Sequence, residues 1–340
     1  MNLLITGSAG FIGSCLTARA VDFGHSVISL DDQSRGLNDV KSVDEKHKFI
    51  KYDCREGIAF ILDEFKHPGE ITAFKYIDDG SGPRDDGVVK NFDCDVVVHL
   101  AAGTGSLSRP YEELCELNID MTKRVYADAV SRGVKVFVFP TTSLVEGVPD
   151  APYVRSKQEA MEWICAQNDD IKVVPLQFYN VLGALGRFSE NRKLEVHIVP
   201  VMLDCYMNDK TFVINGGDYT ETVDGTPGRD FSNVIDVCDM ILLLAERQLS
   251  PTPFKIAKPI KIGTGVTTTT KQMIAMFDAY LEPKFGKKLK TEIGDRRLFD
   301  CGSLRCDQPY VYMVKSPILA EQSLKDEIDA LLKVVYKTEK

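Results

Sequence analysis

The sequence predicts an α/β fold with a doubly wound parallel sheet and a smaller C-terminal α/β domain. Over residues 1–178, short runs rich in β-branched residues alternate with helical stretches, as in a parallel sheet. Several of these runs are apolar throughout, which is typical of strands covered by helices on both faces. After Phe178 the alternation stops, and Pro and Gly become frequent. We therefore expect one domain over residues 1–178, to which residues 230–262 return, and a second over residues 179–340.

Six candidate strands follow one another along the first domain. Their sequences are NLLIT, SVISL, KFIKY, DVVVHL, VKVFVF and KVVPLQF, beginning at residues 2, 26, 48, 95, 134 and 172. Beyond them, residues 233–245 have the apolar spacing of a helix, and residues 261–265 resemble a further strand and turn. Residues 67–92 are longer than an ordinary connection and rich in Gly, Pro and Asp, so we expect a surface excursion without an assigned function.

The composition excludes several classes of protein. With 44% hydrophobic residues over 340 positions, the chain can bury a sizeable core. Its net charge is -9 and its basic residues are scattered among acids, so we expect no nucleic-acid partner. No apolar run approaches the roughly 20 residues that span a bilayer, and no apolar leader precedes the first strand. We therefore expect a soluble, cytoplasmic protein without a membrane partner.

Cysteine and histidine are dispersed along the chain. The nine cysteines contain no C-x-x-C motif, and the five histidines contain no H-E-x-x-H motif. Because a protein metal site needs several such ligands in one place, we expect no metal. The scattered cysteines suit a reducing compartment, which agrees with the expected cytoplasmic location.

A glycine motif marks the turn after the first strand. Gly7, Gly10 and Gly13 form GSAGFIG at the point where the strand should give way to a helix. Glycines let the backbone turn tightly and approach a pyrophosphate, which amide groups and the helix N-terminus then bind. Asp31 follows the second strand, near the position expected for a ribose-binding acid about 20 residues beyond the motif. Its carboxylate favours NAD, although Arg35 leaves NADP open.

A tyrosine and a lysine follow the fifth strand in the stretch PYVRSK. Tyr153 and Lys157 are four residues apart, so they share a face on a helix, and the ammonium would favour the phenolate form of the tyrosine. Thr142 follows the strand at the sheet edge where doubly wound folds bind ligands, and its hydroxyl could relay a proton. Together the three residues predict alcohol oxidation. The alternative is an ordinary helix start at Pro152 with Lys157 as a solvated surface residue.

These motifs occur in the order of a known family. Together with YDCREG, VVVHLAA, ELNIDMT, FYNVLG and GRDFSNVIDV, they extend from about residue 2 to about residue 307. The sequence resembles the extended short-chain dehydrogenase/reductase family, the NAD-dependent nucleotide-sugar epimerases and dehydratases with a Rossmann-type sheet. The stretch INGGDYTETVDGTPGRDFSNV is most similar to the UDP-glucose 4-epimerase group of that family. The resemblance implies NAD as cofactor, a UDP-sugar bound by residues 179–340, and a homodimer formed through helices over residues 111–132 and 153–168.

The resemblance also implies roles for individual positions. The catalytic residues would be Tyr153, Lys157 and Thr142, without a metal. The residues that contact the cofactor would be Gly7, Gly10, Phe11, Ile12, Gly13, Asp31, Asp32, Asp53, Cys54, Leu100, Ala101, Ala102, Asn118, Tyr153, Lys157 and Phe178. The residues that contact the substrate would be Thr142, Asn180, His197, Ile198, Arg229, Arg297 and Asp300. The two arginines suit this role, because a guanidinium can bind phosphate through two parallel hydrogen bonds.

The chemistry of the family is oxidation of a sugar hydroxyl and its reversal. Tyr153 would remove the 4-hydroxyl proton while NAD is reduced, and the 4-keto sugar would rotate and be reduced on its opposite face. Dehydratases of the family carry an acid where this chain has Ser143 and Leu144, so a base for elimination is missing and 4-epimerisation is favoured. A 4-keto-sugar reductase or epimerase-reductase stays open as an alternative, as does a noncatalytic NAD-binding regulator.

Four departures from the family pattern bear on these expectations. The connection from Thr142 to Tyr153 is shorter than in typical relatives, which could displace Thr142 or open the active site. Asn215 stands where the family has an aromatic residue near the nucleotide base, and His197 stands where an Asn is usual. Leu304 occupies the position that sets the room for an N-acetyl group. Its intermediate size leaves both the glucose and the N-acetylglucosamine series open.

Overall fold

Seven strands form the main sheet of the computed structural model, which describes residues 1–40, 46–66, 92–104, 109–191, 197–310 and 318–338. They run in the order β10-β6-β5-β4-β1-β2-β3, and every neighbouring pair is parallel. The bounds are β1 Asn2–Thr6, β2 Ser26–Asp31, β3 His47–Lys51, β4 Val96–His99, β5 Val136–Thr142, β6 Lys172–Phe178 and β10 Ile260–Ile262. The strand order reverses between β1 and β4, and such a switch point is where doubly wound sheets bind ligands. The predicted fold class is confirmed.

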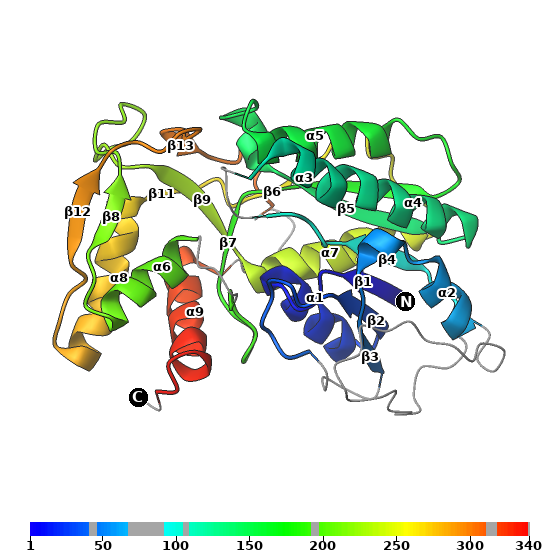
Figure 1. Ribbon diagram of the computed structural model, residues 1–340, viewed down its shortest axis with the longest axis horizontal. Coiled ribbons are helices and arrows are strands. Elements are labelled where there is room, and N and C mark those ends of the chain that lie inside the picture. The colour runs from blue at the N-terminus through cyan, green and yellow to red at the C-terminus, as the bar shows by residue number, and fades with distance from the viewer. Residues whose placement is uncertain (41–45, 67–91, 105–108, 192–196, 311–317, 339–340) are drawn as a thin grey trace.

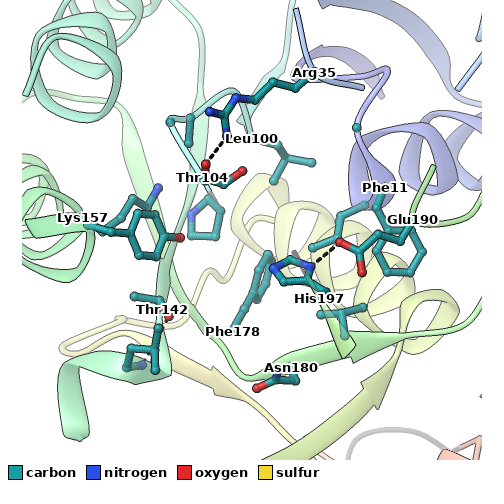
Figure 2. A pocket seen from close by; sticks show the side chains of 18 of the residues that line it. Phe11, Arg35, Leu100, Thr104, Thr142, Lys157, Phe178, Asn180, Glu190 and His197 are labelled. Carbon is teal, nitrogen blue, oxygen red and sulfur yellow. Dashed lines mark hydrogen bonds and ion pairs between the residues drawn. The ribbon is translucent and has the colours of Figure 1, made fainter. Parts of the chain in front are cut away.

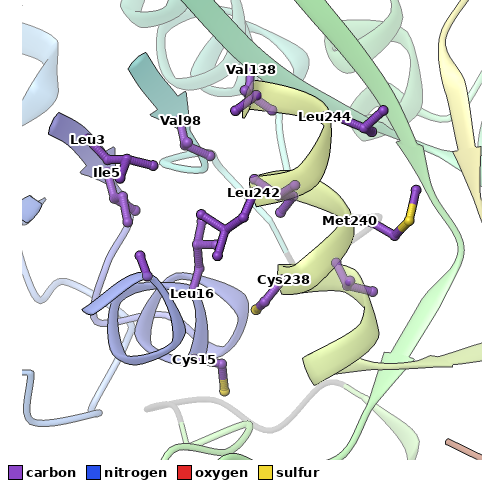
Figure 3. Packing of buried hydrophobic residues seen from close by; sticks show 14 of the residues in the cluster. Leu3, Ile5, Cys15, Leu16, Val98, Val138, Cys238, Met240, Leu242 and Leu244 are labelled. Carbon is purple, nitrogen blue, oxygen red and sulfur yellow. The ribbon is translucent and has the colours of Figure 1, made fainter. Parts of the chain in front are cut away.

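Helices cover both faces of this sheet (Figure 1). Successive residues of β1 point to opposite faces, so Leu3 and Ile5 belong to one buried cluster and Leu4 to the other. Figure 3 shows the first cluster, in which Leu16 of α1 and Leu242 of α7 lie beside the strands. The bounds of the helical segments are α1 Phe11–Asp22, η1 Cys54–Glu56, α2 Ala59–Lys66, α3 Tyr111–Cys115, η2 Glu116–Asp120, α4 Met121–Ser131, η3 Ser143–Glu146, α5 Pro152–Cys165 and α7 Val234–Leu249.

The C-terminal elements lie together at the carboxyl edge of the main sheet, on the left of Figure 1. A small sheet orders β11, β9 and β13, with β7 also paired to β9, and a separate pair joins β8 to β12. The bounds are β7 Asn180–Leu182, α6 Ile198–Met207, β8 Phe212–Asn215, β9 Gly228–Asn233, β11 Thr267–Thr269, α8 Thr270–Phe285, β12 Thr291–Gly294, β13 Ser303–Leu304 and α9 Ala320–Val334. Residues from α6, α8 and α9 build a third buried cluster, which gives this part of the chain its own core.

Local sequence signals explain where several helices begin. Pro152 is the first residue of α5, a position where its missing N–H costs nothing. Thr269 and Gln272 form a capping box at the start of α8, each side chain accepting a hydrogen bond from the backbone of the other. By contrast, Gly10 precedes α1 without any side-chain cap. The first N–H groups of α1 are therefore available for an external anion.

The predicted elements agree with the structure closely, with a few differences in their ends. The strand predicted from residue 134 begins instead at Val136 and extends through Thr142, so this threonine is the last residue of β5. The predicted helix over residues 233–245 is α7, which packs against α1, and β10 joins the main sheet beside β6. The proposed division of the chain at residue 178 stays a prediction. Residues 67–91 of the expected surface excursion lie outside the described residues.

Within the described residues, no helix combines the length and the apolar character needed to cross a membrane.

Candidate active site

A large cavity opens along the carboxyl edge of the main sheet, between that sheet and the C-terminal elements. Its volume is about 1120 Å³. The walls include the glycine turn at one end and the side chains of Arg229 and Arg297 at the other. Every residue predicted to contact cofactor or substrate lines this cavity except Asn118. The fold therefore brings together residues that are far apart in the sequence.

The glycine turn forms a tight cradle at the start of α1. Gly7 has a φ of +73°, and a Cβ on it would lie 2.7 Å from the backbone nitrogen of Ala101. A Cβ on Gly13 would lie only 2.1 Å from the carbonyl oxygen of Gly7, so neither position has room for a side chain. With the uncapped N-terminus of α1 beside it, the turn fits the diphosphate of a dinucleotide.

Asp31 combines a structural and a recognition role at the end of β2. Its carboxylate accepts hydrogen bonds from the backbone N–H groups of Ala9, at 3.0 Å, and Gln33, at 2.6 Å. Burial raises the pKa of Asp31 to about 6, which these two bonds oppose. Arg35 also lines the cavity, and its guanidinium donates to the carbonyl of Thr104 (Figure 2). The cavity lining thus includes both a carboxylate, Asp31, and a guanidinium, Arg35.

The wall of the cavity on the cofactor side also contains Asp53 and Cys54. The Asp53 carboxylate accepts from Nε and Nη2 of Arg55, at 2.9 and 2.6 Å, and these bonds lower its pKa despite partial burial. Burial raises the pKa of the Cys54 thiol well above its usual value. Cys54 is therefore a neutral packing group at working pH, and Asp53 is a carboxylate held in place by its neighbour.

Asn118 lies behind the cavity wall, and its contact with the cofactor stays a prediction. It is 1% exposed and sits in the π-helical turn η2 between α3 and α4. Its amide oxygen accepts from the backbone N–H of Gly103 at 2.7 Å, and its amide nitrogen donates to the Ser156 hydroxyl at 2.9 Å. The Ser156 hydroxyl in turn donates to the carbonyl of Tyr153. Asn118 thus ties the loop after β4 to the start of α5.

Tyr153, Lys157 and Thr142 line the middle of the cavity. Lys157 is only 5% exposed, so its interpretation as a solvated surface residue is wrong. Burial lowers the pKa of Lys157 to about 7, and its ammonium lies 4.3 Å from the ring centre of Phe139. Thr142 remains at the cavity although the following connection is short, and its hydroxyl accepts from the backbone N–H of Leu144 at 3.2 Å. Figure 2 shows Lys157 and Thr142 on the same side of the cavity.

The opposite end of the cavity carries polar groups from four separate segments. Arg229 of β9 donates to the Asp300 carboxylate and, at 3.0 Å, to the carbonyl of Cys301. The Asn215 amide is oriented with its oxygen toward Arg297, and this oxygen accepts from Nε and Nη2 of Arg297, at 3.0 and 3.1 Å. Asn180 lies at the start of β7 (Figure 2). Such a set of fixed donors suits a negatively charged ligand.

The side chain of Glu190 is a cavity residue that the sequence did not predict. It is 2% exposed and forms an ion pair with His197, the residue that precedes α6 (Figure 2). No motif in the sequence signals this pair. Leu304, by contrast, is buried in β13 and does not line the cavity. Within the described residues, no three His, Cys, Asp or Glu side chains group as metal ligands would.

The chain is similar to known nucleotide-sugar epimerases in sequence and in fold. UDP-glucose 4-epimerase from Corynebacterium glutamicum is 26% identical over 325 residues, which cover 89% of this chain and 86% of the relative. The structure superposes on UDP-glucose-4-epimerase from Stenotrophomonas maltophila, solved with NAD and formylated UDP-arabinopyranose, with a TM-score of 0.79, 19% identity and coverage of 99% and 100%. UDP-N-acetylglucosamine 4-epimerase from Methanobrevibacter ruminantium superposes with a TM-score of 0.73, 21% identity and 98% coverage of both chains.

The match at the level of the family covers most of the chain. Residues 3–257 match the NAD dependent epimerase/dehydratase family, a span that begins in β1 and ends beyond α7. It includes the glycine cradle, Asp31, Thr142, Tyr153, Lys157 and Arg229. The resemblance inferred from the motifs is thereby confirmed, and the chain belongs to the NAD dependent epimerase/dehydratase family.

Proposed function

We propose that the protein is an NAD-dependent enzyme that inverts the 4-position of a UDP-hexose of the glucose and galactose type, with N-acetylated forms as further candidates. The observation that carries this proposal is one continuous cavity of about 1120 Å³. It joins the glycine cradle, the group formed by Tyr153, Lys157 and Thr142, and the arginine end of the site. The similarity to a UDP-glucose 4-epimerase from Corynebacterium glutamicum supports the choice of reaction and substrate.

The residues of the chain then have distinct tasks in the reaction. When bound, NAD supplies reversible two-electron oxidation at the sugar. Tyr153 takes the proton from the sugar 4-hydroxyl and later returns it. Thr142 relays this proton between the sugar hydroxyl and the Tyr153 hydroxyl. The Lys157 ammonium stabilises the phenolate of Tyr153. Arg229 and Arg297 bind the diphosphate, so the sugar can turn about its attachment while the nucleotide stays in place.

Elimination is disfavoured by what lies beside Thr142. Ser143 and Leu144 follow it in η3, and neither can act as a carboxylate base. Without such a base the keto sugar has no direct route to loss of water, and reduction of the keto group at C4 is the simpler outcome. This favours epimerisation over dehydration in the same cavity.

The assembly and the location of the protein belong to the same proposal. We expect a homodimer formed through residues 111–132 and 153–168, which cover α3, α4 and α5. None of the nine cysteines forms a disulfide, which fits a reducing cytoplasm. Sedimentation equilibrium of the purified protein tests the dimer.

The experiment that tests the reaction uses UDP-galactose and purified protein without added cofactor. Chromatography of the nucleotide sugars should detect UDP-glucose, because an epimerase regenerates its NAD in each turnover. A reductase would instead need stoichiometric NADH or NADPH. Absence of conversion, with NAD supplied and with UDP-N-acetylgalactosamine also tried, would rule the proposed reaction out.

A further inference from the structure

The short connection between the two proton-handling residues is anchored by one carboxylate. Residues 143–152 join Thr142 at the end of β5 to Tyr153 in the first turn of α5. They begin with η3, whose last residue is Glu146. The Glu146 side chain does not line the cavity. It leaves the connection and reaches β6 and β10 of the main sheet instead.

Two donors from the main sheet, Gln177 and Lys261, and one from the residue after β6, Tyr179, converge on the Glu146 carboxylate. One oxygen accepts from the Gln177 amide and the Lys261 ammonium, each at 2.7 Å. The other oxygen accepts from the Tyr179 hydroxyl at 2.9 Å. Lys261 also forms an ion pair with Asp307, which connects the C-terminal segment to the same group.

Removal of the Glu146 carboxylate would leave buried donors without a hydrogen-bond partner. Gln177 is 6% exposed and Tyr179 is 5% exposed, so water cannot easily replace a lost partner. Partial burial raises the pKa of Glu146, but the hydrogen bonds from Lys261, Gln177 and Tyr179 outweigh it and leave the pKa lowered. The group is therefore a carboxylate throughout the working pH range, and its three bonds are charge-assisted.

The anchored connection is also held from its other side. A Cβ on Gly147 would lie 2.7 Å from the sulfur of Cys301, so the backbone of the connection lies directly against that residue. The carbonyl of Cys301 accepts from Arg229, at the nucleotide end of the cavity. The connection is thus clamped between the main sheet and the segment that carries Asp300 and Cys301.

Thr142 is the residue that such an anchor would affect first. It precedes η3, and its hydroxyl accepts from the N–H of Leu144 inside η3. A shift of η3 would move the Leu144 N–H that donates to this hydroxyl, and the orientation of the Thr142 hydroxyl would change with it. Tyr179, the other residue tied to Glu146, lines the cavity beside Phe178 and Asn180.

We propose that Glu146 is a positioning residue for the reaction, which acts through Thr142 by fixing η3 against Gln177, Tyr179 and Lys261. This inference rests on the proposed function. It explains how the connection keeps the threonine hydroxyl at the cavity.

Steady-state kinetics with UDP-galactose test this role in four variants. Glu146→Gln should lower kcat roughly tenfold to 100-fold, the range expected when a reacting group is misplaced by up to about 1 Å. KM and the content of bound NAD should stay within about twofold, because Glu146 touches neither ligand site. In a Thr142→Ala background, Glu146→Gln should have little further effect, since it acts through that residue. Glu292→Gln, an exposed carboxylate on β12, is the matched control.

Amide hydrogen exchange of residues 143–152 supplies a measurement that does not depend on activity. Exchange in this segment should rise in Glu146→Gln relative to wild type and to Glu292→Gln, while exchange in α7 stays the same. Unchanged kcat, multiplicative effects of the Glu146 and Thr142 substitutions, or unchanged exchange would each overturn the proposal. If the wild type converts no UDP-sugar, the proposed function fails, and the exchange result alone then decides whether Glu146 holds the connection.

Discussion

The ammonium of Lys157 lies where burial disfavours a positive charge. Its ammonium lies 4.3 Å from the centre of the Phe139 ring, and burial lowers the pKa of the lysine to about 7. Lys157 also affects the nearby His99, because burial and the Lys157 charge together lower the pKa of His99 to about 3. A phenolate at Tyr153 would supply the missing counter-charge. An anionic partner in the site would therefore increase the charged fraction of Lys157 near neutral pH.

This depressed pKa predicts a specific dependence of stability on pH. Between about pH 7 and the unfolded value near 10.5, the unfolded chain binds a proton at Lys157 that the folded protein does not, so stability rises with pH. The slope is at most about 1.4 kcal/mol per pH unit, and below pH 7 both states are protonated and this contribution is constant. Lys157→Met should remove this contribution, so stability should rise less, or fall more, from pH 7 to pH 9 in the variant than in the wild type, as measured by urea unfolding.

Lys333→Met is the control for this measurement, because Lys333 is exposed on α9. It should keep the wild-type difference between the two pH values. An equal difference in the wild type and in Lys157→Met would show that other groups cause the pH dependence.

Replacing Tyr153 with Phe separates binding from chemistry. The substitution removes the hydroxyl that exchanges a proton with the sugar and keeps the ring that lines the cavity. Turnover of UDP-galactose should fall by about 100-fold or more, the usual contribution of a general acid–base group. NAD released by acid from the purified variant should match the wild-type amount. Residual turnover near the wild-type rate would assign the proton transfer to another residue.

At the scale of elements, the turn between β1 and α1 depends on the absence of side chains. A Cβ at Gly13 meets the Gly7 carbonyl oxygen at 2.1 Å, whereas a Cβ at Gly10 meets the same atom at 3.2 Å. Gly13→Ala should therefore force the turn open, with a loss of roughly 1–3 kcal/mol or more in unfolding free energy. It should also lower the NAD content of the purified protein.

Gly10→Ala is the graded comparison, because a shift of a few tenths of an ångström accommodates its Cβ. Its NAD content and melting temperature should lie much closer to the wild type. If both variants retain NAD equally, the close approach of Gly13 to Gly7 is not what shapes the cradle.

The elements that could be predicted are those with a strong local pattern. All six predicted strands of the first domain are present, because apolar runs covered on both faces leave little ambiguity. Thr142 was placed correctly at the edge of β5. The buried hydrogen bond from the Asn118 amide to Ser156 was not predicted, because it depends on the π-helical turn η2, which no local motif reveals.

At the scale of the whole molecule, the cavity lies where separate hydrophobic cores adjoin. The main sheet carries two buried clusters, and α6, α8 and α9 contribute to a third. The cavity lies at the boundary, with Tyr153 on one side and Arg229 on the other. The ion pair of Glu146 with Lys261 joins η3 to β10, which are far apart in the sequence, and the ion pair of Glu190 with His197 joins residues seven positions apart. Sequence spacing cannot predict them, because each depends on the assembled fold.

A nucleotide bound at this boundary should stabilise the folded protein as a whole. UDP at 100 times its Kd should raise the unfolding free energy by about 2.7 kcal/mol, since it binds only the folded state. Arg229→Ala removes a guanidinium that Asp300 and the Cys301 carbonyl hold at the cavity. Loss of hydrogen bonds from a charged group, roughly 1.5–3 kcal/mol in binding, should leave an increment of about 1 kcal/mol or less at the same UDP concentration.

The UDP-induced increment is the quantity to compare, because Arg229→Ala also leaves Asp300 without its ion-pair partner and lowers the stability of the free protein. Chemical unfolding with and without UDP measures both values in one series. Arg305→Ala serves as the control, because Arg305 is exposed and lies outside the cavity lining. It should show the full wild-type increment. A full increment in Arg229→Ala as well would mean that the diphosphate is bound elsewhere in the cavity, with Arg297 as the next residue to replace.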